Sequence, residues 1–215
     1  MGAWRGVGRT LAVATLLSAA VVAVGVWKER PDKPATPPLS TSLASLDTSV
    51  VTVRRAPFCS ALRQADVEAA LEEPLLTTDT WGNGDQTDLD NDASTKDSDV
   101  VHEFGCRWAG GDDAVAAWVF APPITGARAT ALATEATKQS GCTSIPGAAP
   151  FGAPSVALEC VRSTEGSGWS DFVYAGLFGD TWLTCTLTGM SNGRTDLADR
   201  WCAAVLGAAS APAAG

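Results

Sequence analysis

Apolar and polar residues alternate in five segments from residue 103 onward, which is typical of strands with one buried and one exposed face. These segments span residues 103–109, 114–121, 156–162, 172–178 and 181–188. Gly110-Gly111-Asp112-Asp113 joins the first two segments, and Gly179-Asp180 joins the last two. Both connections are short and rich in Gly and Asp, so each pair is predicted to form a hairpin.

Three other segments carry apolar residues at helical spacing. The first spans residues 58–73 and is followed by Pro74. The second begins after Thr125, a residue type that caps helices, and runs to Gln139, while the third covers about residues 195–206. The order α-β-β-α-β-β-β-α lacks the regular alternation of a parallel sheet. The sequence therefore predicts an α+β fold in which helices pack on an antiparallel sheet.

The N-terminal region resembles a membrane-targeting segment. Residues 1–9 contain Arg5 and Arg9 and are expected to be cytoplasmic, and residues 10–27 are uncharged and apolar. A helix of this length spans about 27 Å, close to the hydrocarbon thickness of a bilayer, which favours an uncleaved transmembrane anchor. The triplet Ala23-Val24-Gly25 leaves open a cleaved signal and a secreted product, and a buried helix of the domain is the third alternative.

Proline, serine and threonine dominate residues 28–57, a composition typical of an extended, disordered tether. We expect the folded domain to span residues 58–207 and residues 208–215 to form a disordered tail. All six cysteines lie after the apolar segment, and none forms a CxxC pair that would indicate zinc or a thioredoxin-like site. This distribution predicts a single-pass plasma-membrane protein with an extracytoplasmic, disulfide-bonded C-terminal domain.

The positions of the cysteines suggest how they pair. Three of them lie on the apolar faces of expected strands, and the other three adjoin expected helices. Each bridge is therefore expected to fix one helix to the sheet. Among the possible pairings we favour Cys59 with Cys106, Cys142 with Cys160, and Cys185 with Cys202.

Several of these motifs resemble a family of small actinobacterial cell-envelope proteins, many of them lipoproteins, that carry an extracytoplasmic domain of unknown function. The similarity lies in FCSALRQADVEAAL (58–71), in Cys106-Arg107-Trp108 and in a helix with Trp201-Cys202, and it covers about residues 57–206. It implies a disulfide-bonded α+β domain outside the membrane, similar to the sensor domains of some receptor kinases, and it implies no activity. This chain departs from the family in having no lipid-attachment Cys near the end of its apolar segment.

Charge divides the chain into two parts. Residues 1–57 hold seven Lys or Arg and three Asp or Glu, a net charge of +4, whereas residues 58–215 hold eight and 21, a net charge of −13. Non-specific affinity for nucleic acids depends on Lys and Arg that neutralise phosphates, so DNA and RNA are not expected partners.

One acidic segment has the spacing of a calcium loop. Asp88, Asp90 and Asp92 alternate, and Asp99 lies at the twelfth position of such a loop. Ala93 occupies the position that favours Gly, and no amphipathic helices flank the segment. The favoured interpretation is an acidic, mobile surface insertion over residues 79–99, and no metal or cofactor is expected.

Signals for catalysis are weak. The only histidine, His102, precedes an expected strand, and no Gly-x-Ser-x-Gly motif accompanies it. The pairs Glu72-Glu73 and Asp112-Asp113 suggest an envelope hydrolase with paired carboxylates as an alternative function, but they lie at a helix end and a turn, where acids are ordinarily solvated.

Tryptophan is abundant, with eight residues against one tyrosine. Trp81 and Trp169 lie in Gly-rich polar stretches and are candidates for stacking against a sugar or a peptide, the alternative being that each covers an edge of the core. Trp108, Trp118, Trp182 and Trp201 lie in expected elements and are interpreted as core. The sequence thus favours a non-enzymatic module that binds an envelope ligand or partner, with a hydrolase or a scaffold for membrane-protein assembly as alternatives.

Overall fold

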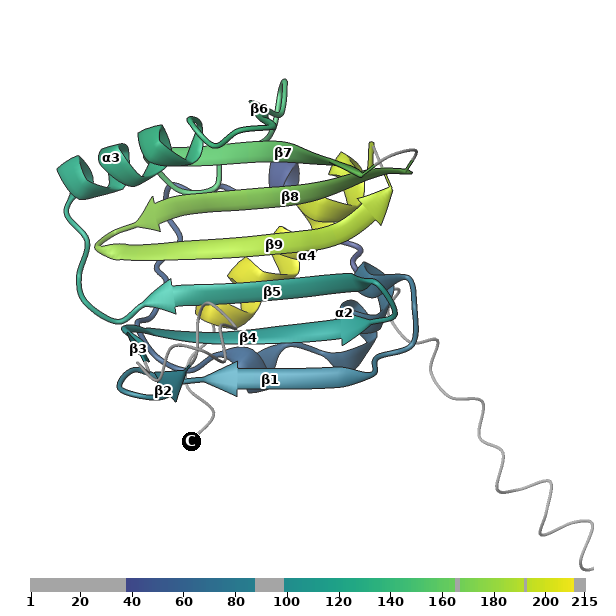
Figure 1. Ribbon diagram of the computed structural model, residues 1–215. Helices are drawn as coiled ribbons and strands as arrows, with labels where there is room; N and C mark the ends of the chain where they lie inside the picture. The colour runs from purple at the N-terminus through teal and green to yellow at the C-terminus, as the bar shows by residue number, and fades with distance from the viewer. Residues whose placement is uncertain (1–37, 88–98, 165–166, 192, 211–215) are drawn as a thin grey trace, which may run out of the picture. The chain divides into compact units, whose positions relative to one another are not determined.

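A seven-stranded antiparallel sheet forms the centre of the domain (Figure 1). The computed structural model describes residues 38–87, 99–164, 167–191 and 193–210. The chain divides into two units, Met1–Pro37 and Pro38–Gly215, and the described residues all belong to the second. The strands follow the order β1-β4-β5-β9-β8-β7-β6, and a separate two-stranded sheet pairs β2 with β3.

The strands are β1 (Thr77–Trp81), β2 (Gln86–Thr87), β3 (Asp99–Val100), β4 (Glu103–Gly110), β5 (Asp113–Phe120), β6 (Cys142–Ser144), β7 (Ser155–Thr164), β8 (Ser167–Phe178) and β9 (Thr181–Ser191). The helices are α2 (Gln64–Leu71), α3 (Gly126–Ala136) and α4 (Thr195–Ser210), with 3-10 turns η1 (Leu43–Ser45) and η2 (Cys59–Ala61). This arrangement confirms an α+β fold with an antiparallel sheet. The five expected strands correspond to β4, β5, β7, β8 and β9, and both hairpins form.

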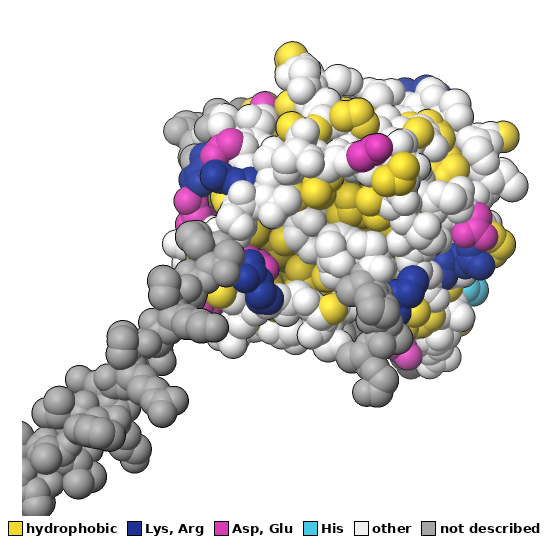
Figure 2. Space-filling model, turned by 180° about the vertical axis from the view of Figure 1, so that it is seen from behind, with side chains coloured by type: hydrophobic (Ala, Val, Ile, Leu, Met, Phe, Trp, Pro, Cys, Tyr) yellow, Lys and Arg dark blue, Asp and Glu magenta, His cyan; other side chains and the backbone are white. Residues whose placement is uncertain are grey.

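The larger core lies between the sheet and the helices α2 and α4, which Figure 1 shows behind the strands. Alternate strand residues such as Val115, Leu183 and Leu187 meet Trp201 and Leu206 of α4 in this core. Figure 2 shows this helix side, where hydrophobic side chains form a band edged by charged residues. α4 therefore buries its apolar face against the sheet in this core.

A smaller core lies on the opposite face of the sheet. Ala129 of α3 packs there with Val156, Leu158, Leu177 and Trp182 of the strands, so α3 covers the β7 and β8 end of that face. Thr125 caps α3 as expected, because its side chain accepts a hydrogen bond from the backbone N–H of Arg128. On the same face, the β1, β4 and β5 end carries none of the described helices (Figure 1).

The boundaries of the domain differ from those expected. Residues 38–57 were expected to be tether, but Leu39, Leu43 and Val53 are buried in the larger core, and the compact unit begins at Pro38. The expected tail was also wrong at its start, because α4 continues to Ser210 with Ala208 and Ala209 buried. A few apolar side chains inserted into the core are enough to order a segment whose composition is typical of a spacer.

The expected insertion over residues 79–99 is partly wrong as well. Residues 79–81 complete β1 at the edge of the main sheet, and β2 and β3 pair with each other. The first expected helix is likewise interrupted, since Leu62 has an extended backbone between η2 and α2.

Three disulfides join Cys59 to Cys106, Cys142 to Cys160, and Cys185 to Cys202. These pairs confirm the pairing expected from the two faces of the strands. The first and third bridges connect a helical segment to a strand, as proposed, but Cys142 lies in β6, so the second bridge connects two strands.

No helix within the described ranges is long and apolar enough to cross a membrane. The candidate anchor at residues 10–27 lies outside those ranges.

Candidate binding face of the sheet

A row of residues crosses the end of the sheet that α3 leaves uncovered. Trp81 of β1 pairs with Gly105 of β4, Gly105 pairs with Trp118 of β5, and Trp118 pairs with Thr184 of β9. Residues paired in this way lie on the same face of a sheet. The row therefore places two indole side chains on either side of a glycine.

Gly105 is buried because the indole of Trp81 lies over it. A Cβ at this position would be 2.8 Å from the Cβ of Trp118 and closer still to the ring of Trp81. Only glycine leaves room for the ring to approach the backbone this closely. Trp81 is consequently held flat against the sheet and stays half-buried.

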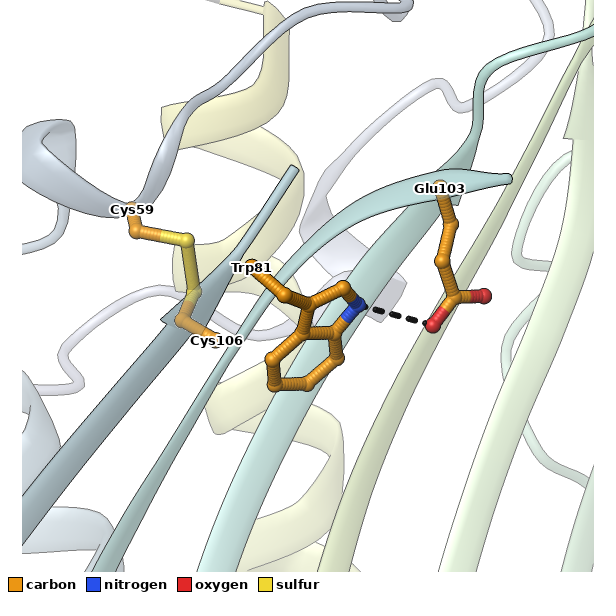
Figure 3. Close-up of a disulfide and its surroundings, with 4 residues drawn as sticks. All are labelled: Cys59, Trp81, Glu103 and Cys106. Carbon is orange, nitrogen blue, oxygen red and sulfur yellow. Dashed lines mark hydrogen bonds between the residues drawn. A yellow bond between two sulfur atoms is a disulfide. The ribbon is translucent and has the colours of Figure 1, made fainter. Parts of the chain in front are cut away.

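Glu103 holds the polar edge of the same indole. The Nε1–H of Trp81 donates a hydrogen bond of 2.9 Å to Oε1 of Glu103, and Figure 3 shows the ring directed at this carboxylate. Burial raises the pKa of Glu103, and the hydrogen bond from Trp81 lowers it in part. The bond therefore favours the ionised carboxylate and fixes one orientation of the ring.

Charged side chains lie in the next row of the same face. Arg107 of β4 pairs with Asp79 of β1 and with Ala116 of β5. The guanidinium of Arg107 is 4.0 Å from the carboxylate of Asp79, and both side chains are about half exposed or more, at 49% and 66%. Because exposed ion pairs are weak, Arg107 and Asp79 can each leave the other and bind a ligand.

The face thus combines two half-buried indoles, a carboxylate with a fixed hydrogen bond, and an exposed arginine–aspartate pair. Indoles offer a large apolar surface at little cost in conformational entropy. The acids and the arginine supply acceptors and donors at the border of this surface. Such a surface suits a ligand that has an apolar face and a rim of hydroxyl or amide groups.

The structure separates the two tryptophans that the sequence singled out. Trp81 ends β1 instead of lying in a loop, and Trp169 lies in β8, with β4, β5 and β9 between them in the sheet. Trp118, interpreted from the sequence as core, belongs to the face with Trp81. Its neighbours in β5 are apolar on both faces, so alternation gave no sign that it faced outward.

The candidate calcium ligands Asp88, Asp90 and Asp92 lie outside the described residues, and Asp99 begins β3. Within the described ranges, no group of three or more His, Cys, Asp or Glu side chains could hold a metal ion. His102 is exposed just before β4.

Both acid pairs meet at one end of the sheet. Burial raises the pKa of Asp113, and the nearby Glu73, Asp112 and Glu72 raise it further, while Arg194 opposes them. Arg194 also donates hydrogen bonds to Glu72 through both terminal guanidinium nitrogens, Nη1 and Nη2. Asp112 and both glutamates are exposed, so this cluster is a solvated surface feature with one bound arginine.

No protein-family model and no curated protein matches the chain.

Proposed function

We propose that this chain is a membrane-anchored, non-enzymatic domain that binds a ligand of the cell envelope through the face around Trp81 and Trp118. The three disulfides indicate an extracytoplasmic domain. The apolar segment at residues 10–27 and the resemblance to actinobacterial envelope proteins support the anchor and the location.

The observation that carries the proposal is the pair of indoles flanking Gly105, with the Trp81 ring held by Glu103. Sugar rings expose C–H groups that stack on aromatic faces, and their hydroxyls bond to carboxylates and guanidinium groups. Glu103, Asp79 and Arg107 provide those groups beside the indoles. We therefore assign a carbohydrate as the ligand.

The charge of the domain narrows the class of carbohydrate. The net charge of residues 58–215 is −13, which repels polyanionic glycans over a long range at low salt. A neutral polysaccharide meets no such repulsion. It fits a face on which the cation Arg107 already has an acidic neighbour, Asp79.

Co-sedimentation of the full-length, detergent-extracted protein with insoluble neutral polysaccharides tests this function. Cellulose and chitin are suitable probes, with a sulfated polysaccharide as the anionic control. We expect retention on at least one neutral polymer, and Trp81→Ala and Trp118→Ala should each weaken it about tenfold. Trp81→Phe, which keeps an aromatic face, should retain most of the binding, and Val50→Ala, at an exposed apolar residue of the N-terminal segment, should retain all of it.

Failure of the unaltered chain to bind any neutral polymer would contradict the assigned ligand class. If Trp81→Ala and Trp118→Ala are retained as strongly as the unaltered chain, the assigned face is contradicted. Release of soluble sugar during the incubation, abolished by Asp113→Asn, would instead support the hydrolase alternative, in which the clustered acids act on a glycan.

A further inference from the structure

The bridge between Cys142 and Cys160 lies at an edge of the sheet. β6 has only three residues, Cys142–Ser144, and is the outermost strand beside β7. The register places Cys142 directly opposite Cys160. This bridge therefore joins two neighbouring strands across a single ladder step, whereas the other two bridges connect the sheet to helical segments behind it.

The three bridges also differ in exposure. Cys142 and Cys160 are both half-buried. Cys59 is also half-buried, but its partner Cys106 is completely buried, as are Cys185 and Cys202, so only the edge bridge has two partly accessible cysteines. A thiolate must reach a disulfide sulfur in order to attack it, and access therefore controls which bridge reacts.

We propose that Cys142–Cys160 is a site of thiol–disulfide exchange with an extracytoplasmic thiol. The thiolate of the reductant attacks one sulfur of the bridge, a mixed disulfide forms, and the other cysteine leaves as a thiolate that takes up a proton. A second thiol then attacks the mixed disulfide and releases the first cysteine. The bridge gains two electrons and two protons and becomes two thiols, while the two thiols of the reductant become a disulfide.

The fold around the bridge is arranged so that this exchange is local. Backbone hydrogen bonds from Val161 to Gly141 (2.9 Å) and from Ile145 to Ala157 (3.0 Å) flank the bridge, so without it the edge should loosen but not detach. The half-buried bridge packs at the border of the smaller core, whose buried residues include Ala129, Val156 and Leu158. Reduction should therefore leave the domain folded.

A groove of about 470 Å³ lies near the bridge, and Ser144, two residues after Cys142 in β6, lines it. One wall is the C-terminal half of α3, with Ala133, Thr134 and Thr137, and the other is formed by residues that follow β6. Ser144 of β6 and Val156 of β7 both line it. Because the bridge fixes β6 to β7, its reduction is expected to let the wall formed by residues 144–150 move relative to the strand.

Differential alkylation of the full-length native protein tests the proposal. The protein is titrated with glutathione in one series and with dithiothreitol in another, labelled, and analysed by peptide mass spectrometry. We expect Cys142 and Cys160 to be labelled about tenfold faster than the other four cysteines in both series, with an unchanged far-ultraviolet circular dichroism spectrum. Labelling of either of the other two bridges at the same rate, or labelling of Cys142 and Cys160 only after unfolding, would overturn the proposal.

A double variant provides the matched control. Cys142→Ser with Cys160→Ser should remove the fast labelling, keep a cooperative unfolding transition, and show faster amide hydrogen exchange in residues 141–145 than in the oxidised chain. Cys185→Ser with Cys202→Ser should instead lower the unfolding temperature strongly, because it removes a bridge inside the larger core. If exchange in residues 141–145 is unchanged in the first variant, the bridge does not hold the edge and the proposal fails.

Discussion

At the scale of single residues, the absence of a side chain at Gly105 shapes the candidate binding face. Because nothing projects from Gly105, the Trp81 ring lies on the backbone of β4, and its Nε1–H reaches Glu103. The ring would otherwise extend into solvent at the sheet edge. One glycine and one carboxylate thus convert a flexible edge tryptophan into a fixed surface, which lowers the conformational entropy that a ligand must remove on binding.

The charge of Glu103 should give the domain a pH-dependent stability. Burial raises its pKa above the ordinary value of 4.5, so the folded state binds the proton more tightly than the unfolded state. The contribution of Glu103 to the free energy of unfolding is fully present below the pKa that it has in the unfolded state. This contribution is lost as the pH rises through the pKa that it has in the folded state. Glu103→Gln keeps an oxygen acceptor for Trp81, and because its amide does not ionise, its contribution to stability does not fall as the pH rises.

We therefore expect Glu103→Gln to be at least as stable as the unaltered chain at pH 7 and the difference to vanish near pH 4. Because Glu103 is only half-buried, solvent screens its charge and the gain should stay below about 1 kcal/mol. Urea unfolding at both pH values measures it. A variant that is clearly less stable at pH 7 would mean that the bond from Trp81 stabilises the charge more than burial opposes it.

Individual residues were unequally predictable from the sequence. Strand parity placed Cys106 and Cys185 on faces with large apolar residues that point at helices, and the favoured pairing is confirmed, although the expectation that each bridge joins a helix to the sheet fails for Cys142 and Cys160. The site was only partly foreseen, because Trp81 was recognised as a candidate but its partners were not. Gly105 and Trp118 become neighbours of Trp81 only through the register of β1, β4 and β5, which depends on contacts distant in sequence.

At the scale of elements, alternation identifies the strands that have one apolar face and fails for the others. β4 and β9 follow the pattern, and their hairpin partners were found with them. β1 reads TTDTW and is mostly exposed at the edge, so it carries almost no hydrophobic signal. β6 is too short to show a period. Edge strands are stabilised mainly by their ladder partner, which a local pattern does not reveal.

Residues 38–57 form the N-terminal segment of the domain, and one buried carboxylate attaches this segment to α2. Asp66 accepts a hydrogen bond of 3.1 Å from the backbone N–H of Leu39 and two from Arg63, at 2.7 and 2.6 Å. It also lies in the first turn of α2, where a negative charge is favourable. Asp66 therefore fixes the start of the helix and the start of the domain together.

Asp66→Ala should destabilise the domain by about 3 kcal/mol, because it leaves the buried N–H of Leu39 without its acceptor and frees Arg63. We also expect faster proteolysis within residues 38–57. Asp47→Ala is the control, since the carboxylate of Asp47 is exposed and bonds only to Ser49 in its own segment. Chemical denaturation and limited proteolysis measure both effects. If Asp66→Ala is as stable and as resistant to protease as Asp47→Ala, the role of Asp66 is contradicted.

At the scale of the whole molecule, the N-terminal segment belongs to the domain that it was expected to tether. It contacts distant parts of the chain: the backbone N–H of Arg54 donates to the carbonyl of Ala209 at 3.2 Å, the Thr181 hydroxyl donates to the carbonyl of Val53 at 3.1 Å, and Arg55 pairs with Asp180. Its composition gave no sign of these contacts, because few apolar side chains anchor it and they have no regular spacing. A domain boundary depends on such long-range contacts, whereas composition reports only local preference.

This boundary leads to a prediction about truncated chains. A chain that begins at Pro38 keeps Leu39, Leu43 and Val53 in the core, and it should fold with the same unfolding temperature as the full-length protein. A chain that begins at Phe58 loses all three. Burial of each such side chain contributes about 1.5–3 kcal/mol, so the total loss of roughly 4–9 kcal/mol approaches the entire stability of a typical domain.

Circular dichroism and thermal unfolding of the two oxidised chains measure the difference. The longer chain should show a cooperative transition, and the shorter chain should be largely unfolded or melt at a much lower temperature, even though all six cysteines remain in it. Unfolding temperatures that agree within a few degrees would show that the disulfides and the remaining core suffice. In that case residues 38–57 would be a bound extension of the domain and not part of its core, and the core would begin at Phe58, where the sequence first placed the start of the domain.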